Sequence, residues 1–197
     1  MSTRATALDG FSTSEMSYGK LGTWLFLASE IMLFGALFSS LILLRTGADS
    51  WPHGYALLNV KLATLNTAFL ITSSVTMVLS YVYIQSGESG KYKLFMWFTI
   101  LLGSAFLVVK YFEYTHKFHL GIYPKSNNFY ATYFTMTGLH VVHVIAGLIV
   151  NAYMALPGLK LYKTNPKQFV SRIECCGLYW HFVDLVWIFL FPTLYLL

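Results

Sequence analysis

Residues 129–156 read FYATYFTMTGLHVVHVIAGLIVNAYMAL, a stretch without a single Asp, Glu, Lys or Arg. A helix crosses the hydrocarbon core of a bilayer with about 20 apolar residues, so this stretch is long enough to span a membrane. A spanning β-strand would need only about 10 residues, with strict alternation of apolar and polar side chains. Because no such alternation is present, the stretch predicts a transmembrane helix.

Four further apolar stretches of similar length occur along the chain. The five predicted spans cover residues 18–44, 57–84, 92–114, 129–156 and 174–197. The loops between them are short, so we expect consecutive helices to be neighbours. The sequence shows no internal repeat and no second domain. It therefore predicts an all-α polytopic membrane protein, with residues 1–197 forming a single membrane domain of five helices in a bundle.

The composition of the chain excludes several other classes of protein. Of the 197 residues, 56% are hydrophobic and only 11% are charged, whereas soluble domains carry about 25% charged residues. This is too little charge to cover the surface of a cytosolic enzyme or to keep a chain disordered. The net charge of +5 does not indicate nucleic-acid binding, because the basic residues are scattered singly between apolar stretches.

The distribution of Lys and Arg predicts an orientation in the membrane. One side of a five-span bundle holds eight of them: Arg4, Lys20, Lys91, Lys93, Lys160, Lys163, Lys167 and Arg172. The other side holds five: Arg45, Lys61, Lys110, Lys117 and Lys125. The positive-inside rule then places the N-terminus in the cytoplasm and the C-terminus outside. Residues 1–17 lack an apolar stretch, so no cleavable signal peptide is expected.

Ionisable side chains within the predicted spans are costly in a membrane and are therefore candidates for function. Glu30 lies near the middle of the first span and has no basic residue within a turn. Its carboxyl must face the bundle interior, either protonated or paired with another helix. It is either a neutral carboxyl bonded to a backbone or hydroxyl group of a neighbour, or a proton-active or lipid-contacting group.

Two histidines lie in the fourth span. His140 and His143 are three residues apart, so we expect them to share a face of the helix. Residues this close cannot bind opposite faces of one haem. We expect hydrogen bonds to other helices rather than metal coordination.

Glu113, at the end of the third span, and His116, just after it, match the Glu-x-x-His spacing of di-iron bundles. Such a site needs two of these motifs, and the chain has one. Neutralisation of Glu113 by Lys110 and Lys117, three and four residues away, is the simpler interpretation.

The fifth span combines polar side chains with large aromatic ones at helical spacing. Glu174 and His181 are seven residues apart, Asp184 follows three residues later, and Trp180 and Trp187 are also seven apart. Each set falls on one side of a helix. We therefore expect these five residues, like Glu113, to take part in packing between helices or subunits.

Four segments on four different spans resemble motifs of one family, subunit III of the haem–copper oxidases. Residues 177–190 (GLYWHFVDLVWIFL) are similar to the signature of its last helix. Residues 137–147 (TGLHVVHVIAG) resemble its Gly-x-His-x-x-His-Val motif. Residues 29–34 (SEIMLF) resemble its buried-glutamate motif, and residues 65–67 (LNT) its Leu-Asn-Thr motif.

The resemblance implies the shorter, five-helix bacterial form of this subunit. It implies a V-shaped cleft that binds phospholipids, with Glu30, His140 and His143 as residues related to lipid binding and proton uptake. It further implies oxidase subunit I as the main partner, then subunit II, with a small subunit IV as an optional partner. Neither a catalytic residue nor a metal ligand is expected in this chain, because haem and copper would be held by the partner subunits.

The resemblance thus predicts a non-redox supporting subunit of a proton-pumping terminal oxidase in the bacterial plasma membrane. The predicted complex is of the cytochrome c oxidase type and reduces O2 to water. Subunit III of a quinol oxidase and an accessory subunit of nitric oxide reductase are the related alternatives. A proton-coupled transporter using Glu30 and Asp184 is disfavoured, because the chain lacks an inverted repeat. A membrane di-iron oxygenase is disfavoured by the single Glu-x-x-His.

Overall fold

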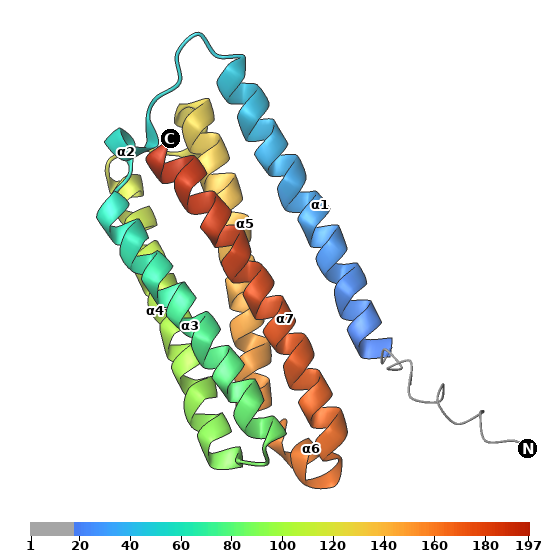
Figure 1. Ribbon diagram of the computed structural model, residues 1–197. Coiled ribbons are helices and arrows are strands. Elements are labelled where there is room, and N and C mark those ends of the chain that lie inside the picture. The colour runs from blue at the N-terminus through green and yellow to red at the C-terminus, as the bar shows by residue number, and fades with distance from the viewer. Residues whose placement is uncertain (1–17) are drawn as a thin grey trace, which may run out of the picture.

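A computed structural model describes residues 18–197 (Figure 1). The long helices are α1 (Tyr18–Thr46), α3 (Val60–Gln85), α4 (Ser89–His119), α5 (Asn128–Ala155) and α7 (Pro166–Phe191). Two short helices, α2 (Gly54–Leu57) and α6 (Leu159–Thr164), lie in the connections, and single turns cover Pro124–Ser126 and Pro192–Leu196. In the described part of the chain, five helices are long and apolar enough to cross a membrane and no strand is present. The predicted all-α membrane fold is confirmed. Arg4, which contributed to the predicted orientation, lies outside the described residues.

Asparagine side chains fix where three of the long helices begin. The side-chain oxygens of Asn59, Asn127 and Asn165 accept hydrogen bonds from backbone N–H groups in the first turns of α3, α5 and α7, at 3.0 to 3.2 Å. These bonds satisfy donors that a helix start leaves free. Pro166, directly after Asn165, is suited to the first helical position because it has no N–H to satisfy. The last long helix therefore begins at residue 166, eight residues before the start of the predicted span at residue 174.

The helix α7 lies between the α3–α4 pair and α1 (Figure 1). In the most apolar window of the last span, 50% of the residues are buried, whereas in α1 the share is 17%. Large apolar side chains of α1, such as Leu25, Met32 and Leu43, are exposed. The helix α1 is thus attached to the bundle along one face, beside α5 and α7.

Two buried tryptophans of α7 contact neighbouring helices. Trp180 Nε1 donates to Ser73 Oγ of α3, and Trp187 Nε1 donates to Thr67 Oγ1 of α3, each at 3.0 Å. Both indoles are completely buried. Gly147 of α5 packs directly against the Trp180 ring, because a Cβ atom there would lie 2.8 Å from the indole. Small residues at such positions allow helices in a membrane to approach closely.

Candidate functional site

Glu30 and His143 form an interhelical pair. Glu30 projects from the middle of α1, and its Oε2 lies 2.9 Å from His143 Nε2 of α5. The side chains are only 15% and 13% exposed, respectively. Of the possibilities that the sequence left open for Glu30, the structure thus shows pairing with another helix.

The second nitrogen of His143 determines how protons are arranged in this pair. Nδ1 lies 2.8 Å from the backbone carbonyl oxygen of Leu139. A carbonyl can only accept, so Nδ1 carries a hydrogen. Nε2 then either accepts a hydrogen bond from a protonated Glu30 or donates one to an ionised Glu30 as part of an imidazolium. The pair thus shares one proton, and its total charge is zero in both arrangements.

A hollow lies between this pair and the end of the bundle where α1 begins. It has a volume of about 560 Å³ and is lined by α1, α5 and α7, with Phe26, Gly147, Asn151 and Tyr179 among its walls. Tyr179 connects the hollow to the pair, since its hydroxyl donates to the backbone oxygen of His143 at 3.0 Å. Phe26 lies one turn before Glu30.

The hollow becomes polar at its outer end. A second hollow of about 810 Å³ shares Gly19, Thr23, Cys175 and Cys176 with the first. Its other walls include Lys167, Gln168, Ser171 and Arg172. We call the two hollows together the α1 groove. The groove thus has a basic mouth and an apolar interior.

Asn151 is an unsatisfied polar group in the apolar part of the α1 groove. It is 1% exposed, and its Nδ2 has no hydrogen-bond partner among the described residues. A buried donor without a partner costs free energy. The amide nitrogen is itself covered by protein atoms, so it lies behind the wall of the groove.

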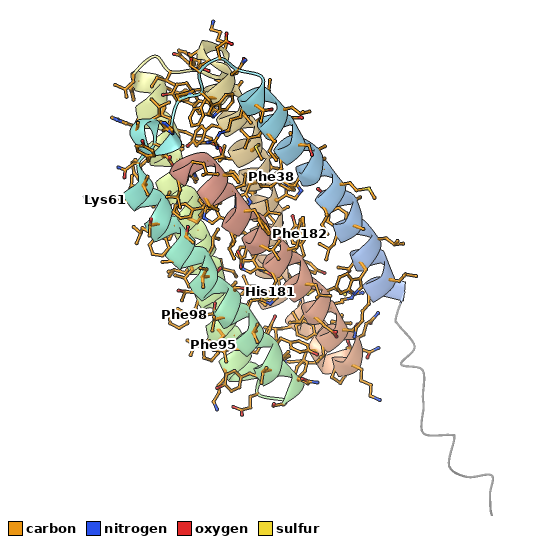
Figure 2. All side chains as sticks on the ribbon, turned by 45° about the horizontal axis from the view of Figure 1, so that its top comes forward. Phe38, Lys61, Phe95, Phe98, His181 and Phe182 are labelled. Carbon is orange, nitrogen blue, oxygen red and sulfur yellow. The ribbon has the colours of Figure 1, made fainter. Side chains whose placement is uncertain are left out.

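A third hollow lies on the other side of the pair, between α1 and α7. It has a volume of about 240 Å³ and is lined mainly by aromatic and aliphatic side chains, including Phe34, Phe38 and Phe182. Figure 2 shows Phe38 and Phe182 between the two helices. The Phe34 ring also contacts the His143 imidazole edge-on, with centroids 5.3 Å apart. The polar pair therefore lies between hollows on both sides along α1.

His140 has a different environment from His143, although the two are three residues apart. Its ring stacks on Trp187 at 5.2 Å and contacts Phe106 edge-on at 5.6 Å. Neither of its nitrogens has a hydrogen-bond partner in residues 18–197. The expected interhelical hydrogen bond is thus made by His143 and not by His140, because aromatic rings of α4 and α7 flank the His140 imidazole.

The polar residues of α7 contact two different helices. Glu174 pairs with Lys20 of α1 at 2.8 Å. His181 Nδ1 lies 2.6 Å from Ser74 Oγ of α3. Asp184 is buried near the same serine, yet neither of its carboxyl oxygens has a hydrogen-bond partner among the described residues.

Glu113 lies in a buried network at the opposite end of the bundle from the mouth of the α1 groove. Its Oε2 accepts from Lys110 Nζ at 3.0 Å, and its Oε1 accepts from the hydroxyls of Tyr133 and Tyr195 at 3.0 Å. The predicted pairing with Lys110 is present. Lys117 instead donates to the Leu57 backbone oxygen at 3.2 Å. Within residues 18–197, no three His, Cys, Asp or Glu side chains converge as metal ligands.

Asn151 and Tyr179 were not identified from the sequence. A signal for Asn151 existed, because it lies eight residues after His143 and therefore near the same face of α5. Tyr179 carried no comparable signal, since its contact depends on how α7 crosses α5. The basic mouth also depends on how α7 crosses α5, although Lys167 and Arg172 were both counted among the basic residues of that end.

The fold and these polar positions define a helical membrane protein with a carboxylate–histidine pair inside the bundle. The profile of the family described as "Cytochrome c oxidase subunit III" matches residues 2–197. The chain therefore belongs to this family of haem–copper oxidase subunits, as the four motifs indicated.

Individual relatives carry related names. The chain is 37% identical over 182 residues to "Cytochrome c oxidase subunit 3" of Bacillus subtilis, covering 90% of this chain and 85% of the relative. It is 33% identical to "Probable quinol oxidase subunit 3" of Staphylococcus haemolyticus, covering 94% of this chain and 92% of that relative. It is also 30% identical to part of "Heme-copper oxidase subunit I+III" of Aeropyrum pernix, covering 88% of this chain and 22% of that longer protein.

Proposed function

We propose that this chain is the non-redox supporting subunit III of a proton-pumping terminal oxidase of the cytochrome c type, which reduces O2 to water. In this proposal it binds phospholipid, stabilises subunit I and supports proton uptake and oxygen access. The observation that carries the proposal is the Glu30–His143 pair, which lies between hollows on the least buried of the five long helices in the described residues.

The α1 groove fits a phospholipid. Lys167 and Arg172 at its mouth would bind the phosphate group. The apolar walls near Phe26 and Val150 would hold an acyl chain. The groove thus offers matching chemistry for the phosphate and the acyl chain, and we propose it as the counterpart of the lipid cleft that the family resemblance implied.

The pair itself supports the proposed link to proton uptake. One proton is shared between Glu30 and His143. When it lies on His143, the two groups form a contact ion pair, and their mutual attraction offsets part of the cost of burying two charges. Both nitrogens of His143 are engaged, one by Leu139 and one by Glu30. This supports a proton-related role for the imidazole in preference to metal coordination.

Subunit I is the proposed main partner, with subunit II and a small subunit IV as further ones. The name of the Aeropyrum pernix relative, "subunit I+III", supports the association with subunit I. Haem and copper would reside in the partners. For the electron donor, the relatives are named as both cytochrome c and quinol oxidase subunits. We propose cytochrome c and retain quinol as the second candidate.

The proposed location is the bacterial plasma membrane, with the N-terminus in the cytoplasm. In the described residues, the end of the bundle where α1 begins carries Lys20, Lys91, Lys93, Lys160, Lys163, Lys167 and Arg172. The excess of basic residues at this end supports the orientation.

Removal of the subunit from the complex tests the proposal. The complex would be purified in mild detergent, its subunits identified by mass spectrometry, and its visible spectrum recorded before and after this chain is stripped off. We expect the haem bands to persist, phospholipid to be lost with the chain, and activity to decay faster during turnover. Loss of a haem band in proportion to this chain would refute the non-redox role.

A further inference from the structure

A basic pocket lies on the side of the bundle formed by α4 and α6, outside the α1 groove. It has a volume of about 270 Å³ and is lined by Lys93, Trp97, Ala155, Leu156, Leu159, Lys160 and Lys163. Figure 1 shows α6 at the end of the bundle where α4 begins. The pocket shares no lining residue with the α1 groove. It is therefore a separate site.

The three lysines of this pocket have no acidic partner among the described residues. Four of the carboxylates in residues 18–197 pair elsewhere, with Lys20, Lys91, Lys110 and His143. Asp184 is buried near Ser74 of α3, and Asp49 follows the end of α1 at the opposite end of the bundle. The pocket thus concentrates positive charge that this part of the chain does not neutralise.

An apolar groove continues from the pocket along α4. It has a volume of about 390 Å³ and is lined by Leu94, Trp97, Phe98, Ile100, Leu101 and Ser104. Trp97 lines both the pocket and the groove. Lys93, Trp97 and Leu101 are successive turns of one helix face. Figure 2 shows Phe98 on the outer side of the α3–α4 pair, and its side chain is 47% exposed.

We propose that the pocket and the groove together bind an anionic phospholipid. The phosphate would contact Lys93, Lys160 and Lys163, and an acyl chain would lie along α4 over Phe98 and Leu101. Basic pockets between helices at the membrane surface recognise anionic headgroups. Tryptophan is favoured at the boundary between headgroups and hydrocarbon, which is where Trp97 would lie. A soluble anion would use the lysines but would leave the apolar groove empty.

The charge part of the proposal is tested in the intact oxidase complex. The wild-type complex and the variant K160Q/K163Q would be placed in phosphatidylcholine nanodiscs with increasing phosphatidylglycerol, and the retained lipid counted by native mass spectrometry. We expect the variant to bind phosphatidylglycerol roughly 25-fold more weakly, about fivefold for each charge removed. The matched control K61Q/K125Q removes the same charge at the opposite end and should retain phosphatidylglycerol as the wild type does.

The groove part is tested by filling it without a change in charge. In L101W, the indole would occupy the space of the acyl chain while the three lysines remain. We expect L101W also to lose the bound phosphatidylglycerol. Retention at the wild-type level in either L101W or K160Q/K163Q would overturn the proposal. An equal loss in K61Q/K125Q would likewise overturn it, because the binding would then follow net charge alone.

Discussion

His143 Nε2 lies 2.9 Å from Glu30 Oε2, and this contact joins α5 to the middle of α1. In its most apolar window, α1 is the least buried of the five long helices in the described part of the chain. A polar bond at this position both fixes the helix and places a carboxyl group between the α1 groove and the third hollow.

The substitution E30Q tests the role of the shared proton. The amide can still donate to His143 Nε2, so the stability of the complex should change by no more than about 1 kcal/mol. The amide cannot release a proton, and we therefore expect slower proton uptake and faster inactivation during turnover, with an unchanged haem spectrum. The control is E88Q, which alters a carboxylate in an exposed surface pair with Lys91. Wild-type kinetics of E30Q in both assays would exclude the proton-related role.

The double substitution K167Q/R172Q tests lipid binding at the mouth of the α1 groove. Each basic residue near a membrane surface contributes about 1 kcal/mol to binding of an anionic lipid. We expect less phospholipid to remain with the purified complex, as measured by mass spectrometry of extracted lipid. K61Q/K125Q is the control, because it removes the same charge at the opposite end of the bundle and leaves the groove residues intact. If wild-type lipid species remain in the groove of K167Q/R172Q, its mouth is not a headgroup site.

The substitution G147A tests the close packing of α5 on Trp180. The added methyl group would lie 2.8 Å from the indole ring, and overpacking of this kind costs about 1–3 kcal/mol. We expect a lower temperature for thermal dissociation of the subunit from the complex. Gly138 on the same helix has no atom within 4 Å of an added Cβ, so G138A should leave the temperature unchanged or raise it. Equal behaviour of the two variants would show that the contact with Trp180 is unimportant.

The buried Lys110–Glu113 pair predicts a non-additive pair of substitutions. K110M leaves the Glu113 carboxylate without its cation, and removal of one partner of a buried pair costs about 3–5 kcal/mol. The double variant K110M/E113Q removes the charge as well and should recover part of this loss. Tyr133 and Tyr195 can still donate to the remaining amide oxygen. Thermal stability measured in one detergent would reveal the recovery, and strictly additive losses would contradict the model of a coupled pair.

The helices were accessible from the sequence because length and hydropathy determine a membrane span directly. The start of α7 was less accessible. Asn165 and Pro166 are typical of a turn, but here the asparagine side chain caps the helix and the proline occupies its first position. An Asn-Pro dipeptide can form a turn or begin a helix, so only the tertiary structure shows which of the two occurs here.

The polar site was only partly accessible from the sequence. Glu30 stood out because a carboxyl group within an apolar span is costly. Its partner His143 is 113 residues away, and the choice of His143 over His140 depends on the direction in which each ring leaves α5. The basic pocket of Lys93, Lys160 and Lys163 likewise arises only when α6 folds against α4. Patterns along the chain identify such residues individually, but the helix arrangement decides which of them meet.

The bond between His143 Nδ1 and the Leu139 carbonyl has a consequence for the route of protons. A residue that conducts protons must receive them at one atom and deliver them at another. Here the Nδ1 hydrogen is held by a carbonyl of the same helix, so only the side of the ring facing Glu30 can exchange. In the proposed proton-related role, the pair would therefore act as a proton reservoir with a single entrance, on the side of α1, rather than as a link in a proton-conducting chain.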